Sequence, residues 1–372
     1  MLRRLESWAD WQIALAIAAL LRLFYSVLAA VVSPFLHPDA ALIRSNTLTD
    51  NLPVPGGWHY ALLGIWERFD TLWYSHIAKH GYDRSASVVF YPLYPWMIRV
   101  LAPLAGGTGG ALLISTVAAW FFIWAMASLA RMDSPGSPPF RVLALIAVWP
   151  ASFFLFAGYT EALAAALVVW SILFARRDGW IAATACALAA GLTRSMGTLL
   201  IVPLLIMAWR ARRWSAWPVL LSPVGTLAYW TWLRATGHMS IAAAYRTYWS
   251  TEVAAPWTTV WRAAASMARH PDSLLAISLA FLVLFTIAGI FAARRIEDRC
   301  FSGAVILHIL LRLCNPPLLG MPRYLLPIYP AFLSMGRMIE KMQRARFAVL
   351  CAALFLFNLV WMWAFLDWSL VL

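Results

Sequence analysis

One carboxylate stands out in this sequence because of the aromatic residues around it. Asp70 lies in the stretch WERFDTLWYSHIAKHGYD, which is soon followed by FYPLYP. Aromatic faces stack on the C–H bonds of sugars, and a partly buried Asp is a good general base for an acceptor hydroxyl. Placed just beyond the first apolar segment, this combination favours sugar transfer at a membrane surface.

Two alternatives compete with Asp70 as the base. Glu67 lies one turn earlier, and it could take the proton itself or serve as a second acid beside Asp70. Asp70 could also be a solvated carboxylate on an amphipathic helix, paired with a Lys or Arg, as surface carboxylates often are. The residue types alone leave these readings open.

The residues from 66 to 80 have the spacing of a helix that lies along the membrane surface. One face, at i, i+3, i+4 and i+7, carries Asp70, Trp73, Tyr74 and Ile77. Gly81 is well placed to end the helix. Within this region we expect sugar contacts from Trp73, Tyr74 and the later Tyr91.

A second carboxylate, Glu161, follows Tyr159 in the stretch FLFAGYTEAL. At a helix start, a carboxylate is stabilised by the helix dipole by about 0.3 to 1 kcal/mol, which is a purely structural role. The functional alternative is a hydrogen bond to a sugar hydroxyl or an ion pair with an arginine. We predict that Tyr159 and Glu161 contact the sugar or the acceptor.

Two arginines lie where topology does not favour positive charge. Arg194 in GLTRSMG and Arg323 in MPRYLLPIYP fall at the predicted outer ends of spans. A guanidinium fork holds phosphate oxygens bidentately, so both are candidate ligands of a donor phosphate, and Lys79 could assist as a point charge. Snorkelling to the headgroup region is the structural alternative. Tyr324, next to Arg323, is a candidate sugar or acceptor contact.

The composition is that of a membrane protein. The chain of 372 residues is 63% hydrophobic and 12% charged, against about 45–50% and about 25% in soluble domains. Net charge is +13, but the arginines fall in short clusters between apolar runs rather than in one stripe. Nucleic-acid binding is therefore a poor explanation of the charge.

About eleven apolar stretches are long enough to be membrane spans. The first has the length of a retained signal anchor, and with a cytoplasmic N-terminus every second connection carries the arginines that the positive-inside rule expects. The predicted spans are 11–32, 109–130, 141–157, 160–175, 179–193, 196–209, 215–234, 273–293, 300–314, 323–338 and 346–366.

The opposite side then holds two long segments, 33–108 and 235–272. Connections this long are uncommon unless they are functional, so the active site is expected on this outer face. Residues 241–269 are rich in Trp, Tyr and Arg, a composition suited to the headgroup region, and predict a second surface helix. The fold class predicted is an all-α polytopic membrane protein, with residues 1–372 forming one integral-membrane domain.

Five motifs carry a family resemblance in order along residues 66–330: FDTLWYSHIAKHGYD, FYPLYP, FLFAGYTEAL, GLTRSMG and MPRYLLPIYP. Together they closely resemble the PIG-V family of GPI mannosyltransferase 2-like proteins, which are multi-spanning GT-C glycosyltransferases. The resemblance implies an inverting transfer of a hexose, usually mannose, from a polyprenyl-phosphate donor on the non-cytoplasmic face, with Asp70 as the catalytic carboxylate. The family usually has Trp where this chain has Phe69.

The sequence indicates no certain cofactor, and it leaves open whether a divalent cation assists the donor phosphate. His76 and His80 have zinc-protease spacing, but Ile77 stands where the catalytic Glu should be and no third ligand is evident. The expected partners are the lipid bilayer, a polyprenyl-phosphate sugar donor, and a glycolipid, glycan or protein acceptor. A lipid-linked-sugar transporter and a noncatalytic membrane subunit are the rival functions, although the chain lacks the repeated halves common in transporters. The composition favours a prokaryotic plasma membrane over an endoplasmic reticulum.

Overall fold

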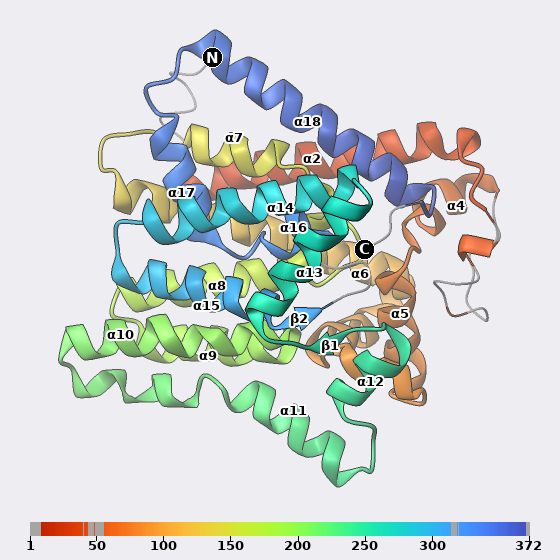
Figure 1. The fold of residues 1–372 in the computed structure, drawn as a ribbon, viewed down its shortest axis with the longest axis horizontal. Helices are drawn as coiled ribbons and strands as arrows, with labels where there is room; N and C mark the ends of the chain where they lie inside the picture. Colours follow the sequence, from red (N-terminus) through yellow and green to blue (C-terminus); the bar gives the residue numbers. More distant parts are fainter. Residues whose placement is uncertain are drawn as a thin grey trace. The chain divides into compact units, whose positions relative to one another are not determined.

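The computed structural model describes residues 9–39, 41–43, 48, 56–313, 318 and 320–369. The chain divides into two compact units. Unit 1 comprises Met1–Gly81, Pro92–Ala166 and Gly336–Val371, and unit 2 comprises Tyr82–Tyr91 and Leu167–Met335, with Leu372. Both units consist of helices (Figure 1).

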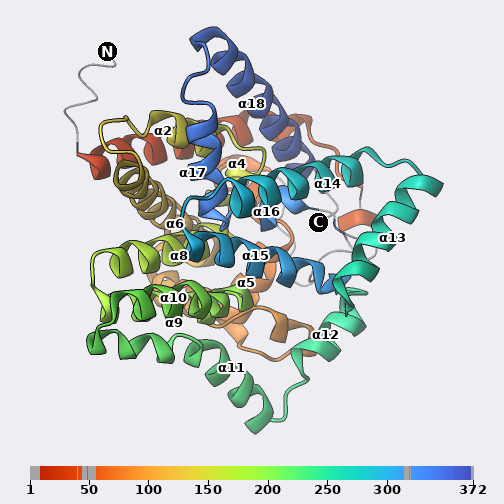
Figure 2. The same ribbon diagram turned by 60° about the vertical axis from the view of Figure 1, so that its left-hand side comes forward.

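Unit 1 is built around the long helix α6, against which α2 and α5 pack (Figure 2). Its elements are α2 (Asp10–Val32), η1 (Ser33–Phe35), α4 (Gly57–Leu62), η3 (Gly64–Trp66), α5 (Asp70–His80), α6 (Leu93–Asp133), α7 (Phe140–Val148), η5 (Ser152–Leu155) and α18 (Arg344–Leu366). Helix α8 (Glu161–Arg176) begins in this unit.

Unit 2 contains a layer in which α9, α10 and α15 run alongside one another, with α11 packed on α9. Its helices are η4 (Ser85–Val89), α9 (Trp180–Thr193), η6 (Ser195–Leu200), α10 (Ile201–Ala211), η7 (Trp214–Leu221), α11 (Val224–Ala235), α12 (Ile241–Tyr248), α13 (Pro256–Arg269), α14 (Ser273–Thr286), η8 (Ile287–Phe291), α15 (Ile296–Leu310), α16 (Met321–Tyr324) and α17 (Tyr329–Met338). Two short strands, β1 (Glu252–Val253) and β2 (Arg312–Leu313), pair antiparallel.

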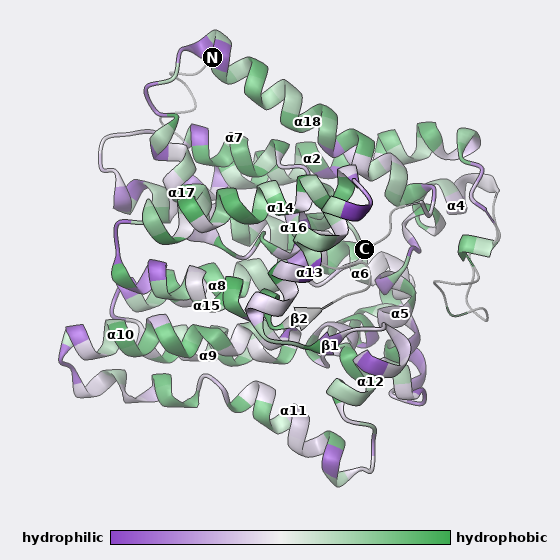
Figure 3. Ribbon diagram, viewed as in Figure 1, coloured by the Kyte–Doolittle hydropathy of each residue, from purple (hydrophilic) through white to green (hydrophobic). Residues whose placement is uncertain are grey.

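Apolar residues dominate the helices and polar residues gather in the connections (Figure 3). Within the described residues, four helical stretches are long and apolar enough to cross a membrane: Asp10–Phe35, Leu93–Asp133, Ser273–Phe291 and Arg344–Leu366. Shorter apolar helices cover Trp180–Thr193 and Ser195–Ala211. The prediction of an all-α, integral membrane protein is thus confirmed. Each predicted span overlaps a helix, but the count of eleven stays a prediction.

The predicted outer segment 33–108 is not a loop throughout. Its last part is already helical, because α6 begins at Leu93. Gly106 has the non-helical values φ 70° and ψ 172°, so α6 consists of two helical stretches that meet at a kink there.

A buried amide joins three apolar elements of unit 1. Asn358 of α18 is fully buried, and its side-chain amide donates hydrogen bonds to the backbone oxygens of Trp149 (2.8 Å) and Pro150 (3.2 Å). Its carbonyl oxygen accepts one from the Tyr25 hydroxyl of α2 at 3.0 Å. Because a polar group in an apolar interior is costly unless bonded, these contacts fix how the three elements pack.

In unit 2, a buried ion pair likewise holds neighbouring helices together. Arg176 contacts both carboxylate oxygens of Asp298, at 3.1 and 2.8 Å, and Tyr329 donates a further hydrogen bond to that carboxylate. The arginine and the aspartate are 3% and 4% exposed. Both contacts come from one nitrogen of Arg176, Nη2, and the shared carboxylate links α8, α15 and α17. The attraction between the opposite charges offsets the cost of burying them.

Candidate functional site

Asp70 begins helix α5, and an unusual backbone geometry places it there. The sequence pattern predicts a helix from residue 66, but Phe69 has φ 46° and ψ −114°, which no helix accommodates. The helix therefore starts four residues later than expected. Such a conformation costs about 1 to 3 kcal/mol and often marks functional sites. Asp70 itself is half-buried.

The aromatic stretch before α8 holds the start of α5. The backbone N–H of Asp70 donates to the Tyr159 hydroxyl at 3.3 Å, and that hydroxyl donates to the backbone oxygen of Arg68 at 3.4 Å. Thr71 donates to the backbone oxygen of Gly158 at 3.2 Å. The motifs FDTLWY and GYTEAL, distant in sequence, thus meet in unit 1.

Gly158 is required for this approach. A Cβ atom at this position would lie 2.6 Å from the Thr71 Cγ2 and 3.3 Å from the Ala111 Cβ. The absence of a side chain therefore lets the backbone before α8 contact both α5 and α6.

Several predicted sugar contacts are too deeply buried to be open surfaces. Tyr159 is fully buried and Tyr74 is 5% exposed, and the Tyr74 hydroxyl is 3.2 Å from the Thr160 hydroxyl. Glu161 is 1% exposed at the first turn of α8. The contacts of Tyr74 and Tyr159 position Asp70 and its helix, whereas direct contact with a sugar stays a prediction.

The two remaining candidates on α5 are more accessible. Trp73 is half-buried, and Lys79 is exposed on the last turn, where a positive charge interacts favourably with the helix dipole. Gly81 follows with φ 78°, so its predicted role in ending the helix is confirmed. Most of the helix between these ends is buried, more than the predicted surface helix would be.

Glu67, the alternative base, is engaged by a neighbour. Its Oε1 accepts a hydrogen bond from the Thr108 hydroxyl at 2.5 Å. Burial raises the pKa of Glu67, while the hydrogen bond from Thr108 and the positive charge of Arg68 oppose the rise. The carboxyl group therefore holds its proton more tightly than an exposed glutamate does.

Sequence reasoning missed the importance of Arg68. This residue is 1% exposed, and its guanidinium donates to the backbone oxygen of Leu366 at 2.9 Å and to the Tyr60 hydroxyl at 2.8 Å. It also lies 5.0 Å from the ring centroid of Trp368. Arg68 is visible in the sequence just before Phe69 and Asp70, but two of its partners, Leu366 and Trp368, lie at the far end of the chain. Arg68 anchors the segment that carries Phe69 and Asp70.

The two predicted phosphate ligands meet in unit 2. The guanidinium carbons of Arg194 and Arg323 lie 5.7 and 5.4 Å from the ring centroid of Tyr324. Arg323 is 4% exposed and Arg194 is half-buried. Two cations against one ring concentrate positive charge, and the ring faces stabilise them. The helix also breaks between α16 and α17, as the prolines of MPRYLLPIYP predict.

The GLTRSMG turn fixes Arg194. A Cβ atom at Gly197 would lie 2.2 Å from the carbonyl carbon of Ala190, so only glycine lets η6 fold back onto α9. The next residue, Ser195, has its hydroxyl 3.2 Å from the Nε2 of His308. His308 is half-buried and belongs to this polar cluster.

Tyr91, a predicted sugar contact, is hydrogen-bonded to a neighbour that the sequence did not single out. It is 5% exposed, and its hydroxyl accepts a hydrogen bond at 3.1 Å from the indole N–H of Trp230. Trp230, from α11, is 45% exposed. The exposed aromatic face next to Tyr91 therefore belongs to Trp230. The hydrogen bond from the indole N–H to the Tyr91 hydroxyl orients that face.

Within the described ranges, no group of three or more His, Cys, Asp and Glu side chains has an arrangement that could hold a metal ion. The rings of His76 and His80 lie 4.8 Å apart between centroids. Cys314 and the prolines at 316 and 317 lie outside the described residues.

No family model and no curated protein matches the chain. Among solved structures, it is similar to the crystal structure of ArnT from Cupriavidus metallidurans bound to undecaprenyl phosphate, with a TM-score of 0.47 and 14% sequence identity. The match covers 89% of this chain and 62% of that chain, so this chain spans less than two thirds of the ArnT chain. The PIG-V resemblance rests on the motifs alone and stays a prediction.

Proposed function

We propose that this protein is an inverting GT-C-type glycosyltransferase that moves a hexose from a polyprenyl-phosphate donor to an acceptor hydroxyl on the non-cytoplasmic face of the membrane. The motif resemblance favours mannose as the hexose. The observation that carries the proposal is the half-buried Asp70, held at the start of α5 by Tyr159 behind a strained Phe69.

Asp70 is the better base because of its surroundings. Its backbone N–H is anchored to the Tyr159 hydroxyl, and the rigid segment around Arg68 fixes the direction of the helix that it begins. A carboxylate on an anchored backbone is better placed for proton transfer, which lowers the entropic part of the barrier. Glu67, by contrast, already accepts a short hydrogen bond from Thr108.

The arginine pair supplies the other half of the chemistry. When the bond between the anomeric carbon and the phosphate oxygen breaks, negative charge grows on the departing polyprenyl phosphate. Arg194 and Arg323, held against Tyr324, are suited to stabilise that charge. The two guanidinium groups are fixed before the reaction and need little reorganisation.

The proposed step balances without a cofactor. The acceptor hydroxyl attacks the anomeric carbon from the face opposite the phosphate and gives its proton to Asp70. A glycosidic bond forms, the bond to the phosphate oxygen breaks, and the configuration inverts. The products are the glycosylated acceptor and polyprenyl phosphate.

The test replaces Asp70 with Asn. Asp70→Asn keeps the shape and the capacity for hydrogen bonding but cannot accept the proton, and general bases contribute about 100- to 10,000-fold. Purified protein with labelled polyprenyl-phosphate mannose and candidate acceptors should lose at least about 100-fold in turnover, with an unchanged melting temperature.

Glu67→Gln is the matched control, because it removes a carboxylate three residues away. We expect it to keep most of the turnover. Near-normal transfer by Asp70→Asn together with loss in Glu67→Gln would move the role of base to Glu67. A wild-type protein that moves labelled donor across vesicle membranes without consuming it would instead indicate a transporter.

A further inference from the structure

Unit 2 contains a pocket that the proposed transfer chemistry does not use. It has a volume of about 790 Å³ and lies between the second half of α11, α12, β1 and the end of α15. Ligand pockets for small molecules usually measure about 300 to 1,000 Å³. The size therefore suits a sugar or a headgroup.

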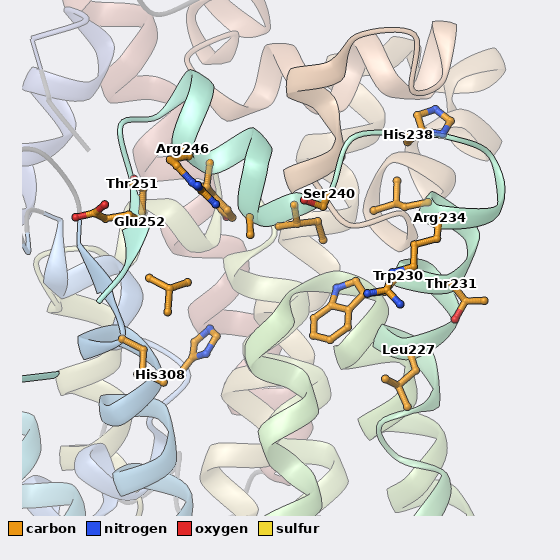
Figure 4. A pocket seen from close by; sticks show the side chains of 16 residues that line it. Leu227, Trp230, Thr231, Arg234, His238, Ser240, Arg246, Thr251, Glu252 and His308 are labelled. Atoms are coloured by element: carbon orange, nitrogen blue, oxygen red, sulfur yellow. The ribbon is translucent and has the colours of Figure 1, made fainter. Parts of the chain in front are cut away.

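Two arginines enter this pocket from different elements. Arg234 comes from α11 and Arg246 from α12, and Figure 4 shows them on different sides of the space. Within the part of the chain that the structure describes, neither guanidinium group has a hydrogen bond or an ion pair. The one carboxylate of the lining, Glu252, is already paired with Arg262 at 3.1 Å. The pocket thus keeps two uncompensated positive charges.

An aromatic wall lies next to one of these charges. Trp230 lines the pocket beside Arg234, and its indole N–H is fixed by the Tyr91 hydroxyl at 3.1 Å. A held indole face loses little freedom when a sugar ring stacks on it. Ser240 and His308 add hydroxyl and imidazole groups to the lining, which can bond to ligand hydroxyls.

We propose that this pocket binds a phosphate ester of a polyhydroxy group, with Arg234 and Arg246 on the phosphate and Trp230 on the carbon skeleton. Guanidinium groups prefer phosphate oxygens, and two from separate elements enclose an anion better than one does. The same chemistry occurs in a soluble sugar phosphate and in an anionic lipid headgroup.

Binding experiments on the full-length protein in neutral phosphatidylcholine nanodiscs test the proposal. The probes are glucose 6-phosphate, glucose, inorganic phosphate and two short-chain lipids, dihexanoyl phosphatidylglycerol and dihexanoyl phosphatidylcholine. We expect calorimetry to show binding of at least one phosphorylated anionic probe and none of glucose or the choline lipid. Preference for glucose 6-phosphate or for phosphatidylglycerol identifies the source of the ligand.

The variant Arg234→Gln/Arg246→Gln should weaken that binding by at least about tenfold, because charged hydrogen bonds are lost. Arg99→Gln/Arg269→Gln is the matched control, since it removes two charges from exposed positions outside the pocket. It should bind within about twofold of wild type. Equal affinities in the two double variants, or no binding of any of the three anionic probes by wild type, would overturn the proposal.

Two further variants separate the parts of the site. Trp230→Leu should weaken the binding of glucose 6-phosphate more than that of inorganic phosphate, because only the sugar uses the indole face. Asp70→Asn should bind the probes as wild type does. A wild-type protein that binds them but transfers no sugar would refute the proposed function alone, whereas transfer without pocket binding would refute only the pocket.

Discussion

Arg323 is a buried arginine beside an aromatic ring, and that position has two explanations. Its guanidinium lies against Tyr324 and is 4% exposed, so it could stabilise the fold near α16 or hold a donor phosphate. The two roles differ in what they ask of the side chain. A phosphate held bidentately needs the planar fork, whereas a charge that only anchors the chain does not.

Arg323→Lys distinguishes them. If the fork holds the phosphate, the rate at subsaturating polyprenyl-phosphate mannose should fall at least about tenfold in Arg323→Lys, almost as far as in Arg323→Ala. The rate is normalised to folded protein. Wild-type rates in the lysine variant, with poor folding of the alanine variant, would remove Arg323 from the donor site and leave Arg194.

Glu67 predicts a pH dependence of stability. Its pKa is raised above the usual 4.5 by burial, so the folded state binds the proton more tightly than the unfolded state does. This contribution to stability is complete below the usual pKa and is lost as pH rises through the raised one. Glu67→Gln has no proton to lose. Relative to this variant, the wild-type melting temperature should fall as pH rises from about 4 to about 8.

The measurement is the difference between the two melting temperatures across that range in one detergent. Asp272→Asn is a control, because it removes an acid from the capping position of α14, in a different unit. A difference between wild type and Glu67→Gln that stays constant, or that favours wild type as pH rises, would contradict the raised pKa.

At the scale of elements, the contact between α5 and the turn before α8 depends on one missing methyl group. Gly158→Ala would place a Cβ atom 2.6 Å from Thr71, so α5 or the turn must move. Overpacking of this kind costs about 1 to 3 kcal/mol. We expect a lower melting temperature and slower transfer, because the shift would also displace Asp70.

Gly303→Ala is the control for that change. A Cβ atom at Gly303 would meet only the Ile290 side chain, at 3.8 Å, and Ala favours the helix α15 by up to about 1 kcal/mol. Its stability and transfer rate should equal or exceed those of wild type. Equal melting temperatures of Gly158→Ala and wild type would mean that the turn accommodates the added methyl group without loss of stability.

The elements also show where sequence patterns suffice. Helical spacing and Gly81 predict the end of α5, and the prolines predict the break before α17. The start of α5 was not predictable, because the backbone of Phe69 depends on packing with Trp368 and on the bond from Arg68 to Leu366, 298 residues away. Sequence patterns report contacts between residues that are close in sequence, and these two contacts join residues that are far apart in sequence.

The candidate site follows the same rule. The motifs identified Asp70, Arg194 and Arg323 as polar residues in apolar surroundings, and the structure brings the two arginines onto one ring. The contact of Trp230 with Tyr91 was not predictable, because the two residues lie 139 residues apart. The sequence contains 22 tryptophans, and nothing in it distinguishes Trp230 from the others before its hydrogen bond is known.

For the whole molecule, the arrangement of charge predicts which connections face the cytoplasm. Arginines cluster at alternate connections between the apolar helices, as the positive-inside rule requires, and the proposed reaction needs the region of Asp70 on the other face. Three exposed positions sample the two sides: Ser85 and Ser250 on the predicted outer face, and Arg212 on the cytoplasmic one. All three can be labelled if a reagent reaches them.

Ser85→Cys, Ser250→Cys and Arg212→Cys, each in a chain whose four native cysteines are replaced, should therefore differ only by membrane side. An impermeant thiol reagent added to intact cells should label the first two and spare the third, which should react after the cells are opened. Ser250 and Arg212 form a matched pair, since both are exposed and have a positive φ, 48° and 50°. Labelling of Arg212→Cys alone in intact cells would put Asp70 on the cytoplasmic side, where the proposed donor orientation would be wrong.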